Sequence, residues 1–478
     1  MPYDFTGCLA HIDLTYRFES GQIIRVTGLL EHDSKCQSIY MQRLPPIPLH
    51  DHVWQVALQQ LNDGARYFNK VNTAKKYLYY ASIAAIQKRN DELCQAKFYT
   101  GQKHMDPTKA NLRYQFLPHD THRLYKKYAQ LHGVDTRVPP EYNIDMWLNP
   151  ASAQYKHELS DAIFYYQARN DQSKCFQVCI QTGDMKRAAW KYSHQQQLIL
   201  DGTFGICDRR LLLFIALGVD EDRKGVPLAF FLFSAPQANM ATQSGYDIKI
   251  LTELLRTWVM SMGEQGNKGF CPKVAITDTD TKERAALLAV WPSICLLLCK
   301  FHVQQCWTNK RRTLLKMGNG YNFSKEQIKK HLHMLEKQSV LCFNTSRHLI
   351  YSTSRLLILD NYEASIGLIE SERLALMQQL TQAEFANAAK AGITFIDYLR
   401  KNWMDRALWQ SWSIQGRSYA SATLGIPIKD VIPTMNHLES FNGILKHKYI
   451  ARWQRGGKRV RFDFLILLLV TQIIPSIF

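Results

Sequence analysis

The pattern of hydrophobic and polar positions is clearest in the middle of the chain, where three short apolar runs follow one another closely. They cover residues 198–200, 211–219 and 226–233, and glycines and charged residues separate them. Short apolar runs bounded by turn residues are typical of buried strands. Because the connections are short, the pattern predicts an antiparallel meander of three strands.

Strands alternate with helices after this meander. Helical periodicity covers about residues 247–262, and a β-branched strand follows at 273–278. A second helical pattern extends over 283–290, and a further apolar strand is predicted at 294–299. Three meander strands followed by helix, strand, helix and strand is the order of elements in a ribonuclease-H-like α/β fold with a mixed sheet.

Two aspartates lie at positions where such a sheet binds ligands. Asp201 directly follows the first apolar run, and Asp278 ends the strand 273–278. A carboxylate in a core strand is costly unless it is paired or holds a metal, and open α/β sheets usually bind ligands at the carboxyl ends of strands. The alternatives are a turn aspartate before Gly202 and, for Asp278, its neighbour Asp280 on the same face.

Four segments of the chain resemble a known family. LILDGTF, AITDTDTKERAALLAVWP, LLCKFH and NHLESFNGILK are similar to segments of Mutator-like element (MULE) transposases of the fungal Hop-like group, and they occur in the same order. The resemblance extends from about residue 50 to the C-terminus. It implies a DDE-type DNA transposase that nicks terminal inverted repeats and joins the freed 3′-hydroxyl to target DNA in the nucleus. We also expect a homo-oligomer on DNA and no membrane partner.

The resemblance assigns catalysis to Asp201, Asp278 and Glu439. Phosphoryl transfer on DNA uses hard oxygen ligands that hold two divalent ions about 3.5–4 Å apart, and Mg²⁺, or Mn²⁺, suits such carboxylates. Glu439 is expected in the first turn of a helix with Asn436 as its N-cap. The alternative for Glu439 is a glutamate that only stabilises the helix dipole.

Cys299 and His302 form a C-x-x-H pair directly after the last predicted strand. The transposases that the chain resembles have this pair, which could order the site, contact DNA or bind a metal. Cys306 adds a third candidate ligand. Buried structural packing explains the pair at least as well, so no zinc site is predicted here.

A basic run lies close behind Glu439. Residues 446–461 contain seven basic side chains and no acid, namely Lys446, Lys448, Arg452, Arg455, Lys458, Arg459 and Arg461. We predict that they contact the phosphate backbone beside the active site. A solvated face or a nuclear-import signal is the alternative. The net charge of +18 also favours a polyanionic partner such as DNA.

The first 50 residues predict a β-hairpin with metal-ligand side chains around it. Residues 11–16 and 22–29 form its strands, with Cys8 at its start and His32 and Cys36 just past its end. This is similar to the zinc-binding FLYWCH/WRKY modules that often precede MULE catalytic domains. A structural Zn²⁺ needs four ligands, so either the first ligand lies further upstream, the module has decayed, or this is a plain hairpin.

The remaining residues complete the predicted organisation. After the hairpin module (1–50), we expect a mostly helical region (51–195), the first part of the catalytic core (196–305), an all-α insertion (306–430) and the final catalytic helix with the basic run (431–478). Within the second region, residues 175–180 fit a strand or a helix. The apolar run 464–470 is too short to span a bilayer and predicts a buried helix end.

Composition narrows the function classes. A hydrophobic content of 46% excludes wholesale disorder. Eleven scattered cysteines and an N-terminus without an apolar signal segment predict free thiols in a reducing compartment. Two rival functions stay open: a non-catalytic DNA-binding descendant, and a ribonuclease-H-like nuclease without strand transfer. The three acids count against the first rival, and the insertion with the C-x-x-H pair counts against the second.

Overall fold

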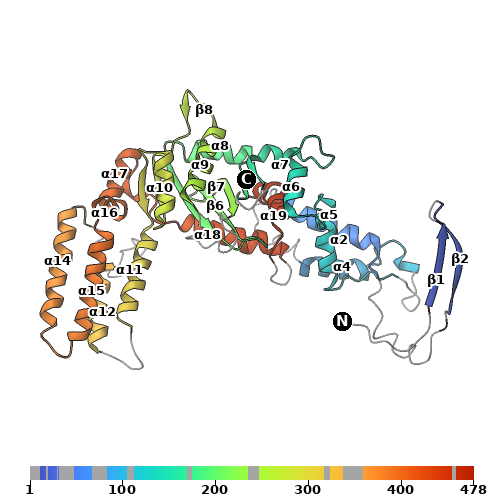
Figure 1. Cartoon of the computed structure of the whole chain (residues 1–478). Helices are drawn as coiled ribbons and strands as arrows, with labels where there is room; N and C mark the ends of the chain where they lie inside the picture. The colour runs from blue at the N-terminus through green and yellow to red at the C-terminus, as the bar shows by residue number, and fades with distance from the viewer. Residues whose placement is uncertain are drawn as a thin grey trace. The chain divides into compact units, whose positions relative to one another are not determined.

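The chain divides into two compact units in the computed structural model. The units are Met1–Tyr128 and Ala129–Phe478 (Figure 1). The structure describes residues 11–17, 20–29, 31, 48–66, 83–104, 112–168, 175–234, 247–316, 323–336, 359–454 and 459–478.

The first unit contains the predicted hairpin and a group of helices. Strands β1 (His11–Arg17) and β2 (Gln22–Leu29) pair antiparallel, which confirms the hairpin. Cys8, His32 and Cys36 lie outside the described residues, so the zinc site stays a prediction. The helical elements are α2 (Asp51–Arg66), α4 (Ile83–Gln95), η2 (Gln102–His104) and α5 (Asp120–Leu131), the last of which runs past the boundary between the units.

The second unit is α/β and is built on a mixed sheet. Among the described residues this sheet has seven strands in the order β11-β10-β5-β6-β7-β4-β3. Strand β10 pairs in parallel with β5 and β11, and the other neighbouring pairs are antiparallel. The predicted meander β5-β6-β7 is thereby confirmed. The strands are β3 (Ile163–Gln167), β4 (Gln177–Ile180), β5 (Gln197–Thr203), β6 (Leu211–Val219), β7 (Gly225–Ser234), β10 (Val274–Thr277) and β11 (Cys295–Leu298).

Two strands of this sheet come from the region that was expected to be mostly helical. β3 pairs with β4, and β4 pairs with β7, so the sheet begins before the predicted boundary near residue 195. β4 is buried along its whole length. A single short buried run cannot be told from a piece of buried helix by periodicity, and this is why the sequence left residues 175–180 open.

Helices cover both faces of the sheet. The alternation of side chains along β7 shows this, because Phe231 packs on Trp258 of α9 and Phe230 packs on Phe441 of α18. The helices around the sheet are α6 (Pro140–Leu148), α7 (His157–Ala162), α8 (Gly183–Tyr192), α9 (Ile248–Met262), α10 (Thr281–Val290) and α18 (Asn436–Ile444). A short hairpin of β8 (Glu264–Gln265) and β9 (Lys268–Gly269) follows α9.

Between β11 and α18, the regular elements that the structure describes are all helices. They are α11 (Lys300–Leu314), α12 (Phe323–Glu336), α14 (Tyr362–Gln379), α15 (Ala386–Trp403), α16 (Arg406–Trp412), α17 (Ile414–Leu424) and η3 (Ile428–Asp430). Figure 1 shows α11, α12, α14 and α15 side by side. They share a core that contains Trp307, Trp403, Trp409 and Trp412.

One buried cation joins this insertion to the sheet. The guanidinium group of Arg417 on α17 donates hydrogen bonds to the carbonyl oxygens of Leu298, Ile432 and Pro433. These carbonyls belong to the end of β11 and to the segment that leads into α18. The two segments that enclose the insertion are therefore held beside each other.

The C-terminal segment completes the fold. Met435 precedes α18 as its cap, so the prediction of Asn436 as N-cap is wrong by one residue. After α18 come η4 (Leu445–Ile450), η5 (Ala451–Trp453), α19 (Phe462–Leu468), η6 (Leu469–Ile473) and η7 (Ile474–Ser476). Residues 464–470 are buried, as predicted. In the described part of the chain, none of the helices combines the length and the apolar character needed to cross a membrane.

Candidate active site

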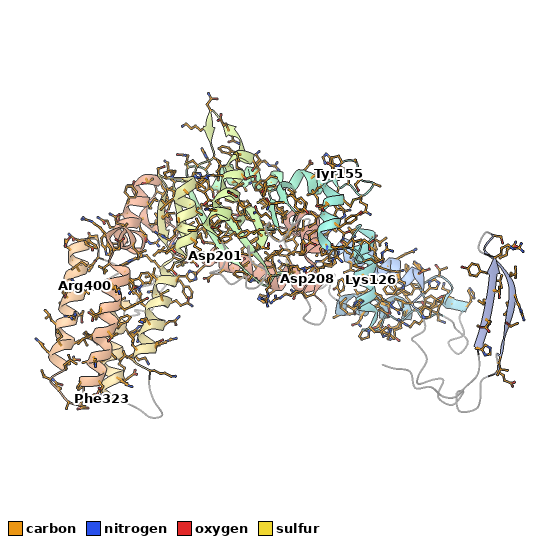
Figure 2. The ribbon with its side chains drawn as sticks, in the orientation of Figure 1. Lys126, Tyr155, Asp201, Asp208, Phe323 and Arg400 are labelled. Atoms are coloured by element: carbon orange, nitrogen blue, oxygen red, sulfur yellow. The ribbon has the colours of Figure 1, made fainter. Side chains whose placement is uncertain are left out.

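The two candidate aspartates lie at the same edge of the sheet. β5 and β10 are parallel neighbours in which Ile199 is opposite Ile276. Extending this register by two residues brings Asp201 level with Asp278. Both side chains line one pocket of 330 Å³. Figure 2 shows Asp201 at the sheet, whereas Phe323 and Arg400 lie on the helices of the insertion.

The charges of these two carboxylates are poorly compensated within the protein. Burial and the negative charge of Asp278 raise the pKa of Asp201 to about 7. Burial likewise raises the pKa of Asp278 above its ordinary value. Burial and like charge both disfavour the ionised form of a carboxyl group. A cation in the pocket would offset both effects.

Asp278 and its rival Asp280 have different local roles. The carboxylate of Asp280 accepts a hydrogen bond from the backbone N–H of Lys282 and thereby caps α10. Oδ1 of Asp278 accepts the backbone N–H of Asp280 at 2.6 Å. Since Asp280 is engaged at the helix terminus, the geometry favours Asp278 as the acid that serves the site.

Glu439 lies near this pocket, at the opposite end of the insertion, but is not among the residues that line it. It lies in the first turn of α18, and its side chain is 42% exposed. His302 Nε2, in the first turn of α11, lies 3.5 Å from Glu439 Oε1. The charges of both groups act on the pKa of Asp201. The fold therefore brings all three predicted acids within electrostatic reach of one another.

The C-x-x-H pair links the end of β11 to the start of α18. The buried Cys299 Sγ accepts the backbone N–H of Met435 at 3.3 Å. Burial acts to raise the pKa of the Cys299 thiol, but its neighbours His302 and Met435 lower it overall. The neighbouring Cys299 and the charges of Asp278 and Asp201 raise the pKa of His302 to about 8, against the effect of burial.

The described residues contain no group of three or more His, Cys, Asp or Glu side chains spaced to hold a metal ion. Cys299, His302 and Cys306 are therefore not arranged as a zinc site. Asp201, Asp278 and Glu439 likewise do not form such a group. All cysteines that the structure describes are free thiols, as the composition predicted.

Two members of the basic run lie next to the end of β5. Lys446 Nζ donates a hydrogen bond to Thr203 Oγ1, two residues after Asp201. Burial lowers the pKa of Lys446, and the charge of Asp201 opposes that change. A Cβ atom placed on Gly205 would lie 3.4 Å from an Nη atom of Arg459, so this guanidinium group is also adjacent to β5. Lys446 is therefore within electrostatic reach of Asp201, and Arg459 lies beside the segment that follows β5.

Among the other basic residues of this run, the structure describes the side chains of Lys448 and Arg461. The ammonium group of Lys448 lies over the ring of Tyr449. Arg455 and Lys458 are outside the described residues, and the side chain of Arg452 is not described.

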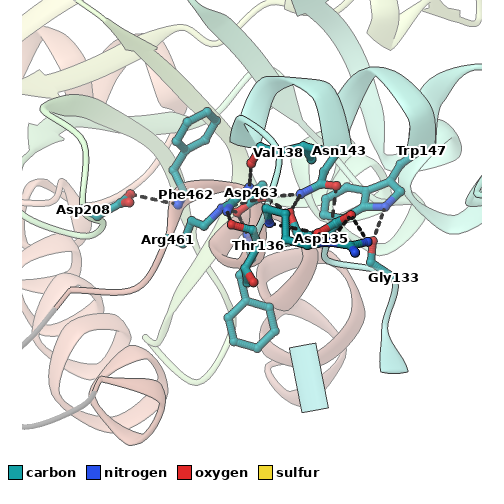
Figure 3. Close-up of polar contacts among 12 residues, drawn as sticks. Gly133, Asp135, Thr136, Val138, Asn143, Trp147, Asp208, Arg461, Phe462 and Asp463 are labelled. Carbon is teal, nitrogen blue, oxygen red and sulfur yellow. Dashed lines mark hydrogen bonds and ion pairs between the residues drawn. The ribbon is translucent and has the colours of Figure 1, made fainter. Parts of the chain in front are cut away.

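Arg461 is engaged in a polar network inside the protein (Figure 3). Its guanidinium group donates to the buried carboxylate of Asp463 and to the carbonyl oxygens of Asp135, Thr136 and Val138. Asn143 Nδ2 donates to the other side of the Asp463 carboxylate at 2.7 Å. Arg461 therefore has a structural role, and its contact with DNA stays a prediction.

One acid that lines the pocket was missed at the sequence level. Glu283 of α10 is 1% exposed and lines the same pocket as Asp201 and Asp278. The helical spacing of the sequence indicated that this acid would be buried, because Glu283 shares the apolar face of α10 with Ala286 and Leu287. An acid at a core position of a helix is unusual enough to indicate a site.

The central segment of the second unit is similar to a known family of domains. Residues 197–306 match the family model of the MULE transposase domain. This MULE segment includes β5, Asp201, Asp278 and the C-x-x-H pair, and the mixed α/β architecture around it is compatible with a MULE transposase. The match suggests a transposase, which is a DNA-processing enzyme that interacts with DNA. No curated protein matches the chain. The resemblance to the fungal Hop-like group stays a prediction.

Proposed function

We propose that this protein is a DDE-type DNA transposase that nicks DNA at terminal inverted repeats and transfers the freed 3′-hydroxyl to target DNA. The observation that carries the proposal is that Asp201 in β5 is level with Asp278, which directly follows the neighbouring parallel strand β10. The charges of His302 and Glu439, which lie 3.5 Å apart, both act on Asp201. The match of residues 197–306 to the MULE transposase domain supports it.

The donor set of the pocket fits Mg²⁺ or Mn²⁺. Asp201 and Asp278 offer hard oxygen ligands, and their raised pKa values indicate negative charge that lacks a partner. Mg²⁺ commonly binds through one or two carboxylates and completes its shell with water and substrate phosphate. Two bound ions would activate the attacking hydroxyl and stabilise the leaving oxygen.

The residues around the pocket would position the DNA strand. Lys446 and Arg459, beside the end of β5, provide positive charge where a phosphate would approach Asp201. Such cations contribute affinity and register without reading sequence. His302 would orient Glu439 and balance part of the negative charge of the acids.

The architecture is consistent with the proposed chemistry. The strands β7-β6-β5-β10-β11 are adjacent in the order expected for a ribonuclease-H-like core, and β4 and β3 extend its β7 edge. An all-helical insertion between the second aspartate and the glutamate agrees with the resemblance to ribonuclease-H-like transposases. As part of the same proposal, the protein acts in the nucleus, as a homo-oligomer on element ends and target DNA.

The decisive experiment is a cleavage assay with the purified full chain. The substrates are a duplex that carries a candidate terminal inverted repeat and a scrambled duplex, each with Mg²⁺, with Mn²⁺ or with a chelator. We expect metal-dependent nicks at the repeat end and joining of the 3′ end to a target plasmid. The Asp201→Asn variant is the matched inactive control.

Two rival functions give different results in the same assay. Binding to the repeat without cleavage in either metal would indicate a non-catalytic DNA-binding protein. Metal-dependent cleavage that is equal on the repeat and the scrambled duplex, with no joined product, would indicate a nuclease. Each result would contradict the transposase proposal.

A further inference from the structure

Glu283 is a buried acid that the proposed chemistry does not use. It lies in the first turn of α10 and is 1% exposed. Its side chain lines the 330 Å³ pocket together with Asp201 and Asp278. Among the described residues its Oε1 atom is buried without any hydrogen-bond partner. Buried polar atoms in proteins nearly always have a partner, so this oxygen requires an explanation.

Helix capping does not provide that explanation. A glutamate three residues after an N-cap often accepts the backbone N–H of the cap residue, and Glu283 stands in that position relative to Asp280. Here, however, the backbone N–H of Asp280 donates to Asp278 Oδ1. The capping bond is therefore already used, and Glu283 is left facing the pocket.

Charge pairing inside the protein does not provide it either. Burial raises the pKa of Glu283 well above its ordinary value, and the negative charges of Asp278, Asp201 and Asp280 raise it further. The neighbouring Arg284 opposes this only weakly, and one of its Nη atoms donates to Thr277 Oγ1. An acid in such surroundings is stable in its charged form only when a cation occupies the pocket.

We propose that Glu283 is a positioning residue of the site, whose charge raises the affinity of the pocket for divalent cations. This inference rests on the proposed function, because it assumes that Asp201 and Asp278 hold such ions. Glu283 acts through the negative electrostatic potential that its carboxylate contributes in the pocket. Its effect therefore resembles that of the outer partners of metal ligands, whose removal commonly weakens metal binding about 10–100-fold.

The test compares Mg²⁺ binding by the full-length protein and its variants after treatment with a chelator. Isothermal titration calorimetry gives the Kd for Mg²⁺, and thermal unfolding with and without Mg²⁺ gives the stabilisation. We expect Glu283→Gln to weaken Mg²⁺ binding about 10–100-fold and to raise the Tm of the metal-free protein, because it removes, at similar volume, the free-energy cost of burying an acidic group. Glu283→Asp, which keeps the charge, should retain most of the affinity.

An exposed acid on α9, Glu253, provides the matched control. Glu253→Gln should change neither the Kd for Mg²⁺ nor the metal-free Tm. If Glu283→Gln lowers the metal-free Tm or fails to fold, the residue is structural and the inference is wrong. If the wild-type protein binds Mg²⁺ and cleaves DNA but Glu283→Gln binds Mg²⁺ equally well, this inference alone fails. If the wild-type protein binds no divalent cation, the proposed function fails with it.

Discussion

His302 Nε2 lies 3.5 Å from Glu439 Oε1, and this contact joins the two ends of the helical insertion at the candidate site. His302 lies just after β11 and Glu439 in the first turn of α18. The charge of His302 also opposes the rise in pKa that burial causes at Asp201 and Asp278. The C-x-x-H pair thus connects the segment that starts the insertion with the acid that follows it.

The first prediction concerns this histidine. His302→Gln should reduce the rate of DNA nicking about 10–100-fold, a loss typical of residues that orient a metal ligand. In a double-mutant cycle with Glu439→Gln, the two losses should be strongly non-additive, because both changes act on one contact. The measurement is the single-turnover nicking rate. Additive losses would show that His302 acts independently of Glu439.

The second prediction separates the two neighbouring aspartates. Asp201→Asn, Asp278→Asn and Glu439→Gln should each reduce nicking about 10³-fold or more, since metal assistance is worth several kcal/mol and each 1.36 kcal/mol is tenfold in rate. Asp280→Asn should stay active, because asparagine also caps helices well. DNA binding measured in a chelator should be nearly unchanged in all four variants. An active Asp278→Asn with an inactive Asp280→Asn would reverse the assignment.

The third prediction concerns the cations beside β5. Lys446→Ala and Arg459→Ala should each make the dependence of log affinity on log salt shallower by about 0.9. The loss should be equal for repeat and scrambled duplexes, because phosphate contacts carry no sequence information. Fluorescence anisotropy across a salt series measures the slope. Lys390→Ala, at an exposed position on α15, is the control. An unchanged slope in both test variants would assign these cations another role.

The fourth prediction concerns Arg461, which lies in the same basic run but belongs to the network of Figure 3. Arg461→Ala leaves the fully buried Asp463 carboxylate and three carbonyl oxygens without this donor. Removing one partner of a buried ion pair costs about 3–5 kcal/mol, so the free energy of unfolding should fall by about 3 kcal/mol. Urea unfolding measures it. A loss of DNA affinity with unchanged stability would instead make Arg461 a DNA contact.

Much of the central sheet could be predicted because its signals are local. The apolar runs before Asp201 and Asp278 end at the candidate site residues, and short connections specify the meander. Strands β3 and β4 were harder to predict, since neither short run shows a clear period and β7, with which β4 pairs, lies far along the chain.

The site shows the same division between local and distant information. Asp201 and Asp278 could be predicted from their strands. The environment of Glu283, in contrast, depends on the hydrogen bond that the backbone N–H of Asp280 donates to the Asp278 carboxylate. Lys446 and Arg461 look equivalent in the sequence. The fold gives them different partners. Lys446 donates a hydrogen bond to Thr203, whereas Arg461 pairs with the buried Asp463 carboxylate and donates to carbonyl oxygens of residues 135–138.

The fifth prediction concerns pH. Burial and, secondarily, the charge of Arg417 lower the pKa of Lys300 to about 8. An unfolded lysine has a pKa of about 10.4, so between about pH 8 and pH 10 the unfolded state binds more protons than the folded state. The contribution of Lys300 to the free energy of unfolding therefore rises with pH across this window. Below about pH 8 both states are protonated, and the full cost of burying the charge remains.

Lys300→Met should remove this cost at similar side-chain length. At pH 7 the variant should be more stable than the wild type by an amount on the order of 1 kcal/mol, since one pKa unit corresponds to about 1.4 kcal/mol. The difference should shrink as the pH approaches 10, where the wild-type lysine is neutral in the folded protein. Urea unfolding at several pH values measures the difference, and Lys390→Met on the exposed face of α15 is the control. A difference between Lys300→Met and the wild type that stays constant from pH 7 to pH 10 would contradict a lowered pKa for Lys300.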